Sequence, residues 1–143
     1  MSLSSADISH VKGIWSKAKG KGGDLGKEAL QRMFCSSPQT KTYFAHWGEN
    51  PQDSPNTAIH GKKIFDAIND AVDHISDIHG ALSKLSDLHA TKLKVDPANF
   101  KILSHNILVT LSRNFPSDFT PEVHLSFDKF LDQVALSLAE KYR

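Results

Sequence analysis

The 143-residue sequence has one cysteine, no apolar run longer than three residues and almost no excess of charge. A single cysteine, Cys35, excludes an intrachain disulfide framework and a thiolate metal cluster. The short apolar runs exclude a membrane-spanning helix, which needs about twenty residues, and the core of a signal peptide. We therefore expect a soluble, cytoplasmic protein with no membrane partner.

The charge is balanced, because 17 lysines and arginines against 16 aspartates and glutamates leave a formal net charge of +1. Nucleic-acid clamps need concentrated positive charge, so we expect no nucleic-acid partner. The length is that of one ordinary domain with a single hydrophobic core. The composition is even and contains no repeat, so residues 1–143 are expected to form one domain.

Proline positions and apolar spacing both predict helices. A capping polar residue followed by proline is typical of a helix start, and Ser4 with Asp7 resembles a capping box. Between these starts, apolar residues recur at helical spacing, and no convincing strand or hairpin signal is present. The sequence therefore predicts an all-α fold of six to seven helices. The polar–proline pairs are Ser37-Pro38, Asn50-Pro51, Ser54-Pro55, Asp96-Pro97 and Thr120-Pro121.

Two glycines, Gly26 and Gly61, lie inside predicted helices. Each should destabilise its helix by up to about 1 kcal/mol relative to alanine, so some contact must offset that loss. We expect a close crossing in which the two helices touch backbone to backbone. Two tolerated surface glycines are the alternative.

The eight histidines raise the question of a metal site. No two of them are three or four residues apart, and the HExxH motif is absent, so zinc hydrolase chemistry is disfavoured. No phosphate-binding glycine loop has the required spacing either.

His60 and His89 differ from the other histidines because each lies among apolar helix-facing positions. Two inward imidazoles on different helices could face each other across a slot. A flat, mostly apolar cofactor carrying a metal would satisfy them. Two separate core histidines with ordinary hydrogen-bond partners remain the alternative.

The whole chain resembles vertebrate haemoglobin α-type chains of the globin family. The short connection between Phe44 and His60, and the Tyr142-Arg143 ending, are similar to the α type rather than the β type. The stretches that carry the resemblance are Pro38-Gln39-Thr40-Lys41-Thr42-Tyr43-Phe44, His46-Trp47, His60-Gly61-Lys62-Lys63, Leu85-Ser86-Asp87-Leu88-His89-Ala90, Lys92-Leu93, Val95-Asp96-Pro97, Asn99-Phe100-Lys101, Phe119-Thr120-Pro121-Glu122, Asp128-Lys129-Phe130 and Lys141-Tyr142-Arg143.

The resemblance implies a globin fold around a pocket for haem b, iron protoporphyrin IX. His89 is then the proximal iron ligand, its other ring N–H bonded to the Leu85 carbonyl or the Ser86 hydroxyl, and His60 is the distal residue that hydrogen-bonds bound O2. The other implied haem-slot residues are Tyr43, Phe44, His46, Trp47, Lys63, Ile64, Leu85, Leu88, Leu93, Val95, Asn99, Phe100, Leu103, Val134 and Leu138.

The resemblance also implies a red-cell oxygen carrier that binds O2 and CO, is not an enzyme, and pairs with β-type chains in a cooperative α2β2 tetramer. The implied quaternary contacts involve Tyr43, Asp96, Asn99, Asp128, Tyr142 against Val95, and Arg143. His105 and His124 are expected at the partner interface, and His10, His74 and His79 in solvent. Three residues depart from the common α pattern, namely Gln39, Ala45 and Trp47, the last standing where many α chains carry phenylalanine.

Two other functions stay open from the residues themselves. The first is a globin that chiefly turns over nitric oxide or peroxide, although nothing resembles a reductase domain. The second is a haem-free helical interaction module, which would stay folded without a cofactor.

Overall fold

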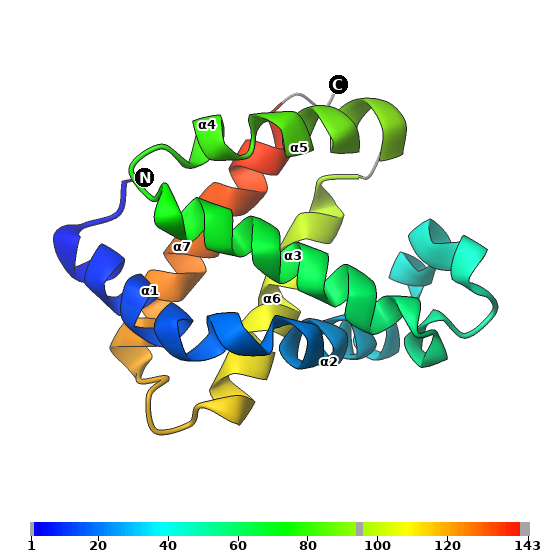
Figure 1. The fold of residues 1–143 in the computed structure, drawn as a ribbon, viewed down its shortest axis with the longest axis horizontal. Helices are drawn as coiled ribbons and strands as arrows, with labels where there is room; N and C mark the ends of the chain where they lie inside the picture. Colours follow the sequence, from blue (N-terminus) through cyan, green and yellow to red (C-terminus); the bar gives the residue numbers. More distant parts are fainter. Residues whose placement is uncertain (1, 94–95, 141–143) are drawn as a thin grey trace.

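The computed structural model describes residues 2–93 and 96–140, without the side chains of residues 92 and 93. Within these residues the chain is all-helical and contains no strand, which confirms the predicted fold class (Figure 1). The seven α-helices are α1 (Ser5–Ala18), α2 (Gly22–Ser36), α3 (Asn56–Asp73), α4 (Ile78–Ala81), α5 (Ser83–Leu88), α6 (Ala98–Asn114) and α7 (Pro121–Ala139). Shorter elements are the 3-10 segments η1 (Lys19–Lys21), η2 (Pro38–Trp47) and η3 (Pro51–Asp53) and the π-helical η4 (His89–Leu93).

Local capping explains where several helices begin. The Ser4 hydroxyl accepts a bond from the Asp7 N–H at 3.1 Å, and the Asp7 carboxylate accepts one from the Ser4 N–H at 2.9 Å, which confirms the capping box. Thr120 caps α7 with a single bond, because its hydroxyl accepts from the Val123 N–H at 3.2 Å. The other polar–proline pairs are less regular: α3 and α6 begin one residue after their prolines, and the remaining two pairs open 3-10 segments.

The segment between α2 and α3 is irregular and short. η2 runs from Pro38 to Trp47 and is kinked at Phe44 (φ −124°, ψ 19°). It ends at Gly48, whose φ of 111° lies in a region that side-chain-bearing residues rarely adopt. Between η2 and α3 the only regular element is the three-residue η3, so the connection contains no α-helix.

The α2 and α3 helices cross at Gly26 and Gly61. A Cβ added at Gly26 would collide with the backbone of Gly61, and one added at Gly61 would lie 2.6 Å from the Lys27 nitrogen. The predicted backbone-to-backbone crossing is therefore confirmed. It places the first half of α3 directly on α2 (Figure 1).

The main core lies where α1, α2, α3, α6 and α7 meet. Its largest side chains are fully buried, and the Trp15 ring lies 5.1 Å from Phe65 and 6.1 Å from Phe127. The Trp15 indole N–H donates to the Asn69 side-chain oxygen at 3.0 Å, so its polar atom is satisfied. None of the helices in the described ranges is both long and apolar enough to cross a membrane.

A polar cluster joins the start of α1 to the first half of α7. The buried Asp7 carboxylate accepts bonds from the Ser126 hydroxyl at 2.7 Å and the Lys129 ammonium at 3.2 Å. The Ser4 backbone N–H, followed by the Ser126 hydroxyl, holds the pKa of Asp7 well below its usual range. His10 lies 2.9 Å from the Ser126 oxygen, so it is a half-buried member of this cluster, whereas it was expected in solvent.

Candidate functional site

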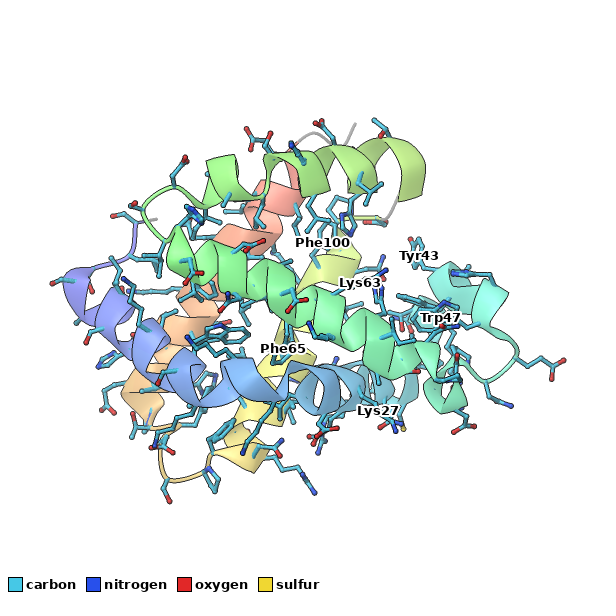
Figure 2. The ribbon with its side chains drawn as sticks, viewed as in Figure 1. Lys27, Tyr43, Trp47, Lys63, Phe65 and Phe100 are labelled. Carbon is cyan, nitrogen blue, oxygen red and sulfur yellow. The ribbon has the colours of Figure 1, made fainter. Side chains whose placement is uncertain are left out.

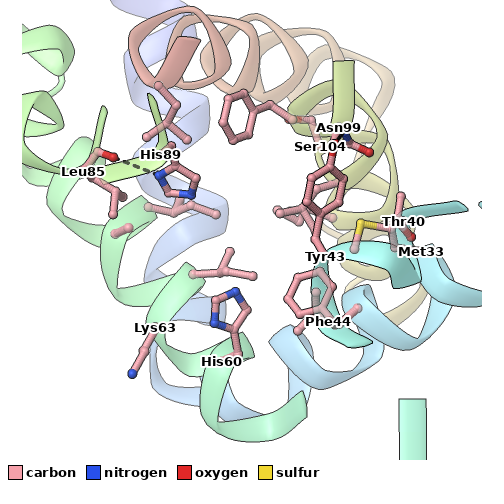
Figure 3. Close-up of a pocket in the computed structure, with 18 of the residues that line it drawn as sticks. Met33, Thr40, Tyr43, Phe44, His60, Lys63, Leu85, His89, Asn99 and Ser104 are labelled. Atoms are coloured by element: carbon pink, nitrogen blue, oxygen red, sulfur yellow. Dashed lines mark hydrogen bonds between the residues drawn. The ribbon is translucent and has the colours of Figure 1, made fainter. Parts of the chain in front are cut away.

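A cavity of about 420 Å³ opens between η2, α3, α5, α6 and α7. This volume is in the range of sites that hold a small molecule or cofactor. Apolar side chains form most of its wall, and the polar side chains come mainly from η2 and α3, with His89 entering at the end of α5 and Asn99 from α6 (Figure 3). The cavity lies between the start of α3 and the end of α5. Because α3 packs on α2 through the face that carries Gly61, a different face of α3 is free to line the cavity.

His60 enters the cavity from α3 beside two aromatic rings of η2. The centroid of its imidazole lies 5.5 Å from that of Phe44 and 5.6 Å from that of Trp47, both in edge-to-face geometry. Burial lowers the pKa of His60, and the positive charge of Lys63, followed by His89 and His46, lowers it further. The imidazole is therefore neutral at pH 7, with one N–H available to donate.

His89 enters from the end of α5, where its Nδ1 lies 2.8 Å from the Leu85 carbonyl oxygen (Figure 3). A carbonyl can only accept, so Nδ1 carries the proton and Nε2 has a free lone pair. Phe100 packs edge-to-face on the same ring at 5.3 Å. The ring is thus held in one orientation, with a basic nitrogen left to bind a metal.

Ser86, the other acceptor considered for His89, has a different partner. Its hydroxyl is buried and donates to the Leu138 carbonyl at 3.1 Å. This bond ties α5 to α7 three residues before the π-helical turn that begins at His89, and its acceptor belongs to Leu138, which lines the cavity.

Most residues predicted for the site line this one cavity. They are Tyr43, Phe44, His46, Trp47, His60, Lys63, Ile64, Leu85, His89, Asn99, Phe100, Leu103, Val134 and Leu138. Leu88 does not line it and is 38% exposed. Val95 and the side chain of Leu93 lie outside the described residues.

The structure adds lining residues that the sequence reasoning did not include. Some could have been found from helical spacing, because Ala67 and Ile68 follow Ile64 by three and four positions. Others come from α2 and η2, which no local pattern relates to His60. The additional residues are Leu30, Met33, Thr40, Asn56, Ile59, Ala67, Ile68, Leu82, Ser104, Ile107, Leu131 and Ala135.

Tyr43 and Asn99 close the cavity on the side opposite α3 (Figure 3). The Asn99 amide donates to the Tyr43 hydroxyl at 3.3 Å, and the Asp96 backbone N–H does so at 3.4 Å. The Tyr43 hydroxyl accepts in both bonds, so its own proton is left for another acceptor. Among the other residues expected in quaternary contacts, Asp128 is exposed, and Tyr142 and Arg143 lie outside the described residues.

The donor set of the cavity suits a cofactor better than a bare metal ion. Across residues 2–93 and 96–140, no three histidine, cysteine or carboxylate side chains are grouped so that they could hold an ion. One fixed imidazole with a free Nε2, a neutral imidazole on another helix and an apolar wall together fit a flat, metal-carrying cofactor that supplies most of the metal ligands itself.

Comparisons with known proteins agree with this geometry. Residues 27–138 match the model of the family described as Globin. The chain is 54% identical over 142 residues to Hemoglobin subunit alpha-4 of Oncorhynchus mykiss, spanning 99% of this chain and 100% of that protein. It is 54% identical over 143 residues to Hemoglobin subunit alpha of Cyprinus carpio, spanning 100% of both. It is 56% identical over 144 residues to Hemoglobin subunit alpha of Leiostomus xanthurus, spanning 99% of this chain and 100% of that protein.

Proposed function

The chain belongs to the globin family, and on that basis we propose that it is an oxygen-carrying α-type subunit of a haemoglobin that holds haem b in the cavity between His60 and His89. It is an oxygen carrier and not an enzyme. The observation that carries the proposal is the hydrogen bond from His89 to the Leu85 carbonyl, because it leaves Nε2 unprotonated and fixed in direction.

Haem supplies a ferrous iron that binds O2 reversibly when one coordination position stays open. His89 would hold that iron through Nε2 on one side. The carbonyl that accepts from Nδ1 makes the imidazole a stronger donor to the metal and prevents the ring from turning. Phe100 supports the ring from the α6 side.

His60 would act on the gas from the other side. Its lowered pKa keeps the ring neutral, so it presents one N–H to a ligand that becomes partly negative on binding. Such a bond strengthens O2 binding far more than binding of CO, which stays close to neutral. The apolar wall, with Ile64 and Leu103 among its members, excludes the water that promotes oxidation of the iron.

The open edge of the cavity carries polar side chains that could contact the charged propionates of a haem. Lys63 and His46 line this edge and are exposed, so they would reach the propionates from the solvent side. Tyr43 and Asn99 line the opposite side of the cavity.

The partner in this proposal is a β-type haemoglobin chain, in an α2β2 tetramer within the red-cell cytoplasm. The Tyr43 hydroxyl only accepts in its two hydrogen bonds, so its proton would be available to donate to another subunit, and the exposed Asp128 carboxylate would be available to accept. Asp96, Asn99, Tyr142 and Arg143 belong to the same proposed set, which would change partners on oxygenation. Cooperative binding then requires the tetramer and is absent from the isolated chain.

The visible spectrum of the haem-loaded ferrous chain tests the proposal. We expect a five-coordinate spectrum without O2 and a reversible change on oxygenation. A six-coordinate bis-histidine spectrum in the deoxy form would contradict simple carriage. Oxygen equilibrium curves, with and without a β-type chain and at two pH values, test the assembly. Hyperbolic, pH-insensitive curves in both cases would remove the cooperative part of the proposal.

A further inference from the structure

Two side-chain contacts join α4 and α5 to the end of α7. The Nδ1 atom of His79, on α4, lies 2.9 Å from a carboxylate oxygen of Glu140, the residue that follows α7. Further along the chain, the Ser86 hydroxyl donates to the Leu138 carbonyl at 3.1 Å. Both short helices pack against the end of α7 (Figure 2). The two contacts therefore fasten one stretch of chain, residues 78–88, to α7.

The local structure of α4 fixes the direction of His79. The Asp77 side chain accepts from the Gly80 N–H at 3.1 Å and so caps this four-residue helix. A Cβ at Gly80 would lie 2.8 Å from the Asp77 carboxyl carbon, so the absence of a side chain permits this tight cap. Ile78 is buried in the main core. His79 follows Ile78 and is therefore directed outward, where it contacts Glu140.

The fastened stretch and α7 both contribute to the wall of the cavity. Leu82 and Leu85 line it from the stretch, and Leu138 lines it from α7. His89, the proposed iron ligand, comes directly after α5. Separation of residues 78–88 from α7 would therefore open the cavity on the side that carries His89.

The His79–Glu140 pair has a neutral form and a charged form. An ionised carboxylate only accepts, so Nδ1 of His79 carries a proton in both forms. Histidine side chains generally change charge between pH 5 and pH 8, whereas glutamate side chains are ionised above about pH 6. Acidification from about pH 8 to pH 6 therefore adds a proton at Nε2. A neutral hydrogen bond becomes an ion pair, which is the stronger contact.

Other charged groups lie on the elements packed against α4. Asp77 is engaged by Gly80, and the ring of His74 lies 2.9 Å from the Asp70 carbonyl oxygen. The carboxylates among these groups favour a charged His79, as Glu140 does, whereas the lysine ammonium opposes it. Variants that alter the pair alone separate its effect from theirs. The groups are Asp70, Asp73 and His74 at the end of α3, Asp77 before α4, and Lys84 and Asp87 on α5.

From these contacts we propose that the His79–Glu140 pair is an acid-strengthened fastening of residues 78–88 to α7, which slows the opening of the cavity on the His89 side as the pH falls. The fastening does not depend on the proposed oxygen-carrying function. Its effect on haem retention rests on that function.

Amide hydrogen exchange of the haem-loaded, CO-bound chain measures the fastening. Exposed ion pairs shift local equilibria by about two- to four-fold. At pH 6, protection factors for residues 78–88 and the last turn of α7 should be higher by that factor in the wild type than in His79→Gln. The difference should shrink at pH 8, where the ring is neutral. His79→Lys supplies a permanent cation and should make the protection independent of pH.

Two further variants identify the partner. Glu140→Gln should lose the same acid-dependent protection as His79→Gln, and the double variant should lose no more than either. His74→Gln is the matched control, because His74 is an exposed histidine whose ring nitrogen lies against a backbone carbonyl and not a carboxylate. Its protection should equal that of the wild type at both pH values. Circular dichroism checks that each variant remains folded.

The rate of haem transfer to an acceptor protein measures the effect on the cavity. Acid also acts through other histidines, among them His60, so the rate of His79→Gln is divided by that of the wild type at each pH. We expect this ratio to be about two at pH 6 and about one at pH 8.

The outcomes separate the fastening from the function. Equal protection of the wild type, His79→Gln and Glu140→Gln at pH 6 would overturn the fastening. Acid-dependent protection with the same haem-transfer ratio at both pH values would overturn its effect on the cavity. A wild-type chain that bound no haem would refute the proposed function itself.

Discussion

The two walls of the cavity hold their histidines by different kinds of contact. On the α5 side, His89 is fixed by a 2.8 Å hydrogen bond to a carbonyl of its own helix. On the α3 side, His60 is held by the rings of Phe44 and Trp47. A hydrogen bond to a carbonyl determines which nitrogen carries the proton, whereas ring contacts restrict position only. In the proposed function, the contact at His89 suits a permanent metal ligand, and the contacts at His60 suit a transient hydrogen-bond donor.

The walls also differ in how they are anchored. α3 rests on α2 through the backbone crossing at Gly26 and Gly61, which leaves no space for a side chain. α5 has only six residues and is tied to α7 by the Ser86 hydroxyl and by apolar packing. His60, which ring contacts hold, thus lies on α3, the helix that is packed more tightly against its neighbour.

The first and largest expected effect is on cofactor retention. His89→Ala removes the proposed iron ligand, and we expect haem affinity to fall by about 100-fold or more. The rate of haem transfer to an acceptor protein measures it. His60→Ala is the matched control on the other wall and should keep most of the affinity. Equal haem loss from both variants would refute the contrast between the two walls.

The second prediction concerns the packing of α3 on α2. Gly61→Ala introduces a methyl group against the Lys27 nitrogen and the Gly26 backbone, so the two helices must move apart. We expect the free energy of unfolding to fall by about 1–3 kcal/mol, measured by urea denaturation of the CO-bound protein. Gly13→Ala is the control, since the added methyl meets nothing and alanine is the better helix former. Equal stabilities of the two variants would contradict the crossing.

The third prediction concerns the contact between α5 and α7, where we expect a smaller loss of stability. Ser86→Ala removes the hydroxyl that donates to Leu138, which should lower the free energy of unfolding by about 1 kcal/mol. Faster amide hydrogen exchange confined to α5 would locate the change. Ser9→Ala, at an exposed position of α1, serves as the comparison. If α5 exchanged no faster in Ser86→Ala than in Ser9→Ala, the hydroxyl would not anchor the wall.

The smallest expected effect is the dependence of stability on pH. Burial, followed by the charge of Lys63, lowers the pKa of His60 below its unfolded value of about 6.5. The unfolded chain therefore binds this proton first, and stability falls as the pH drops below about 6.5 toward the folded pKa. We expect His60→Leu to lose less Tm between pH 7.5 and pH 5.5 than the wild type. Parallel pH profiles would show that His60 is not buried enough to matter.

Features that depend on neighbouring residues could be predicted from the sequence. The Ser4 capping box and the Thr120 cap involve residues three positions apart, so the pattern alone determines them. The glycine crossing was also predictable although Gly26 and Gly61 are distant in sequence, because a glycine inside a helix is a local signal that a compensating contact is needed. The inward placement of His60 and His89 followed from the apolar positions around them.

Features that depend on distant parts of the chain could not be predicted in this way. Leu30 and Met33 reach the cavity only because α2 passes beneath α3. His10 is half-buried because Ser126, from the far end of the chain, lies against it. Leu88 was placed at the wall by family resemblance, yet it precedes His89 by one residue, and adjacent helical residues point about 100° apart.

His60 and Gly61 are consecutive, and this adjacency makes the α2–α3 crossing an angular reference for α3. A helix can in principle roll about its own axis, and a roll of one residue, about 100°, would carry the imidazole out of the cavity. Here such a roll would drive a neighbouring side chain into the backbone of α2. The absence of a side chain at one position thus determines the direction of the side chain before it.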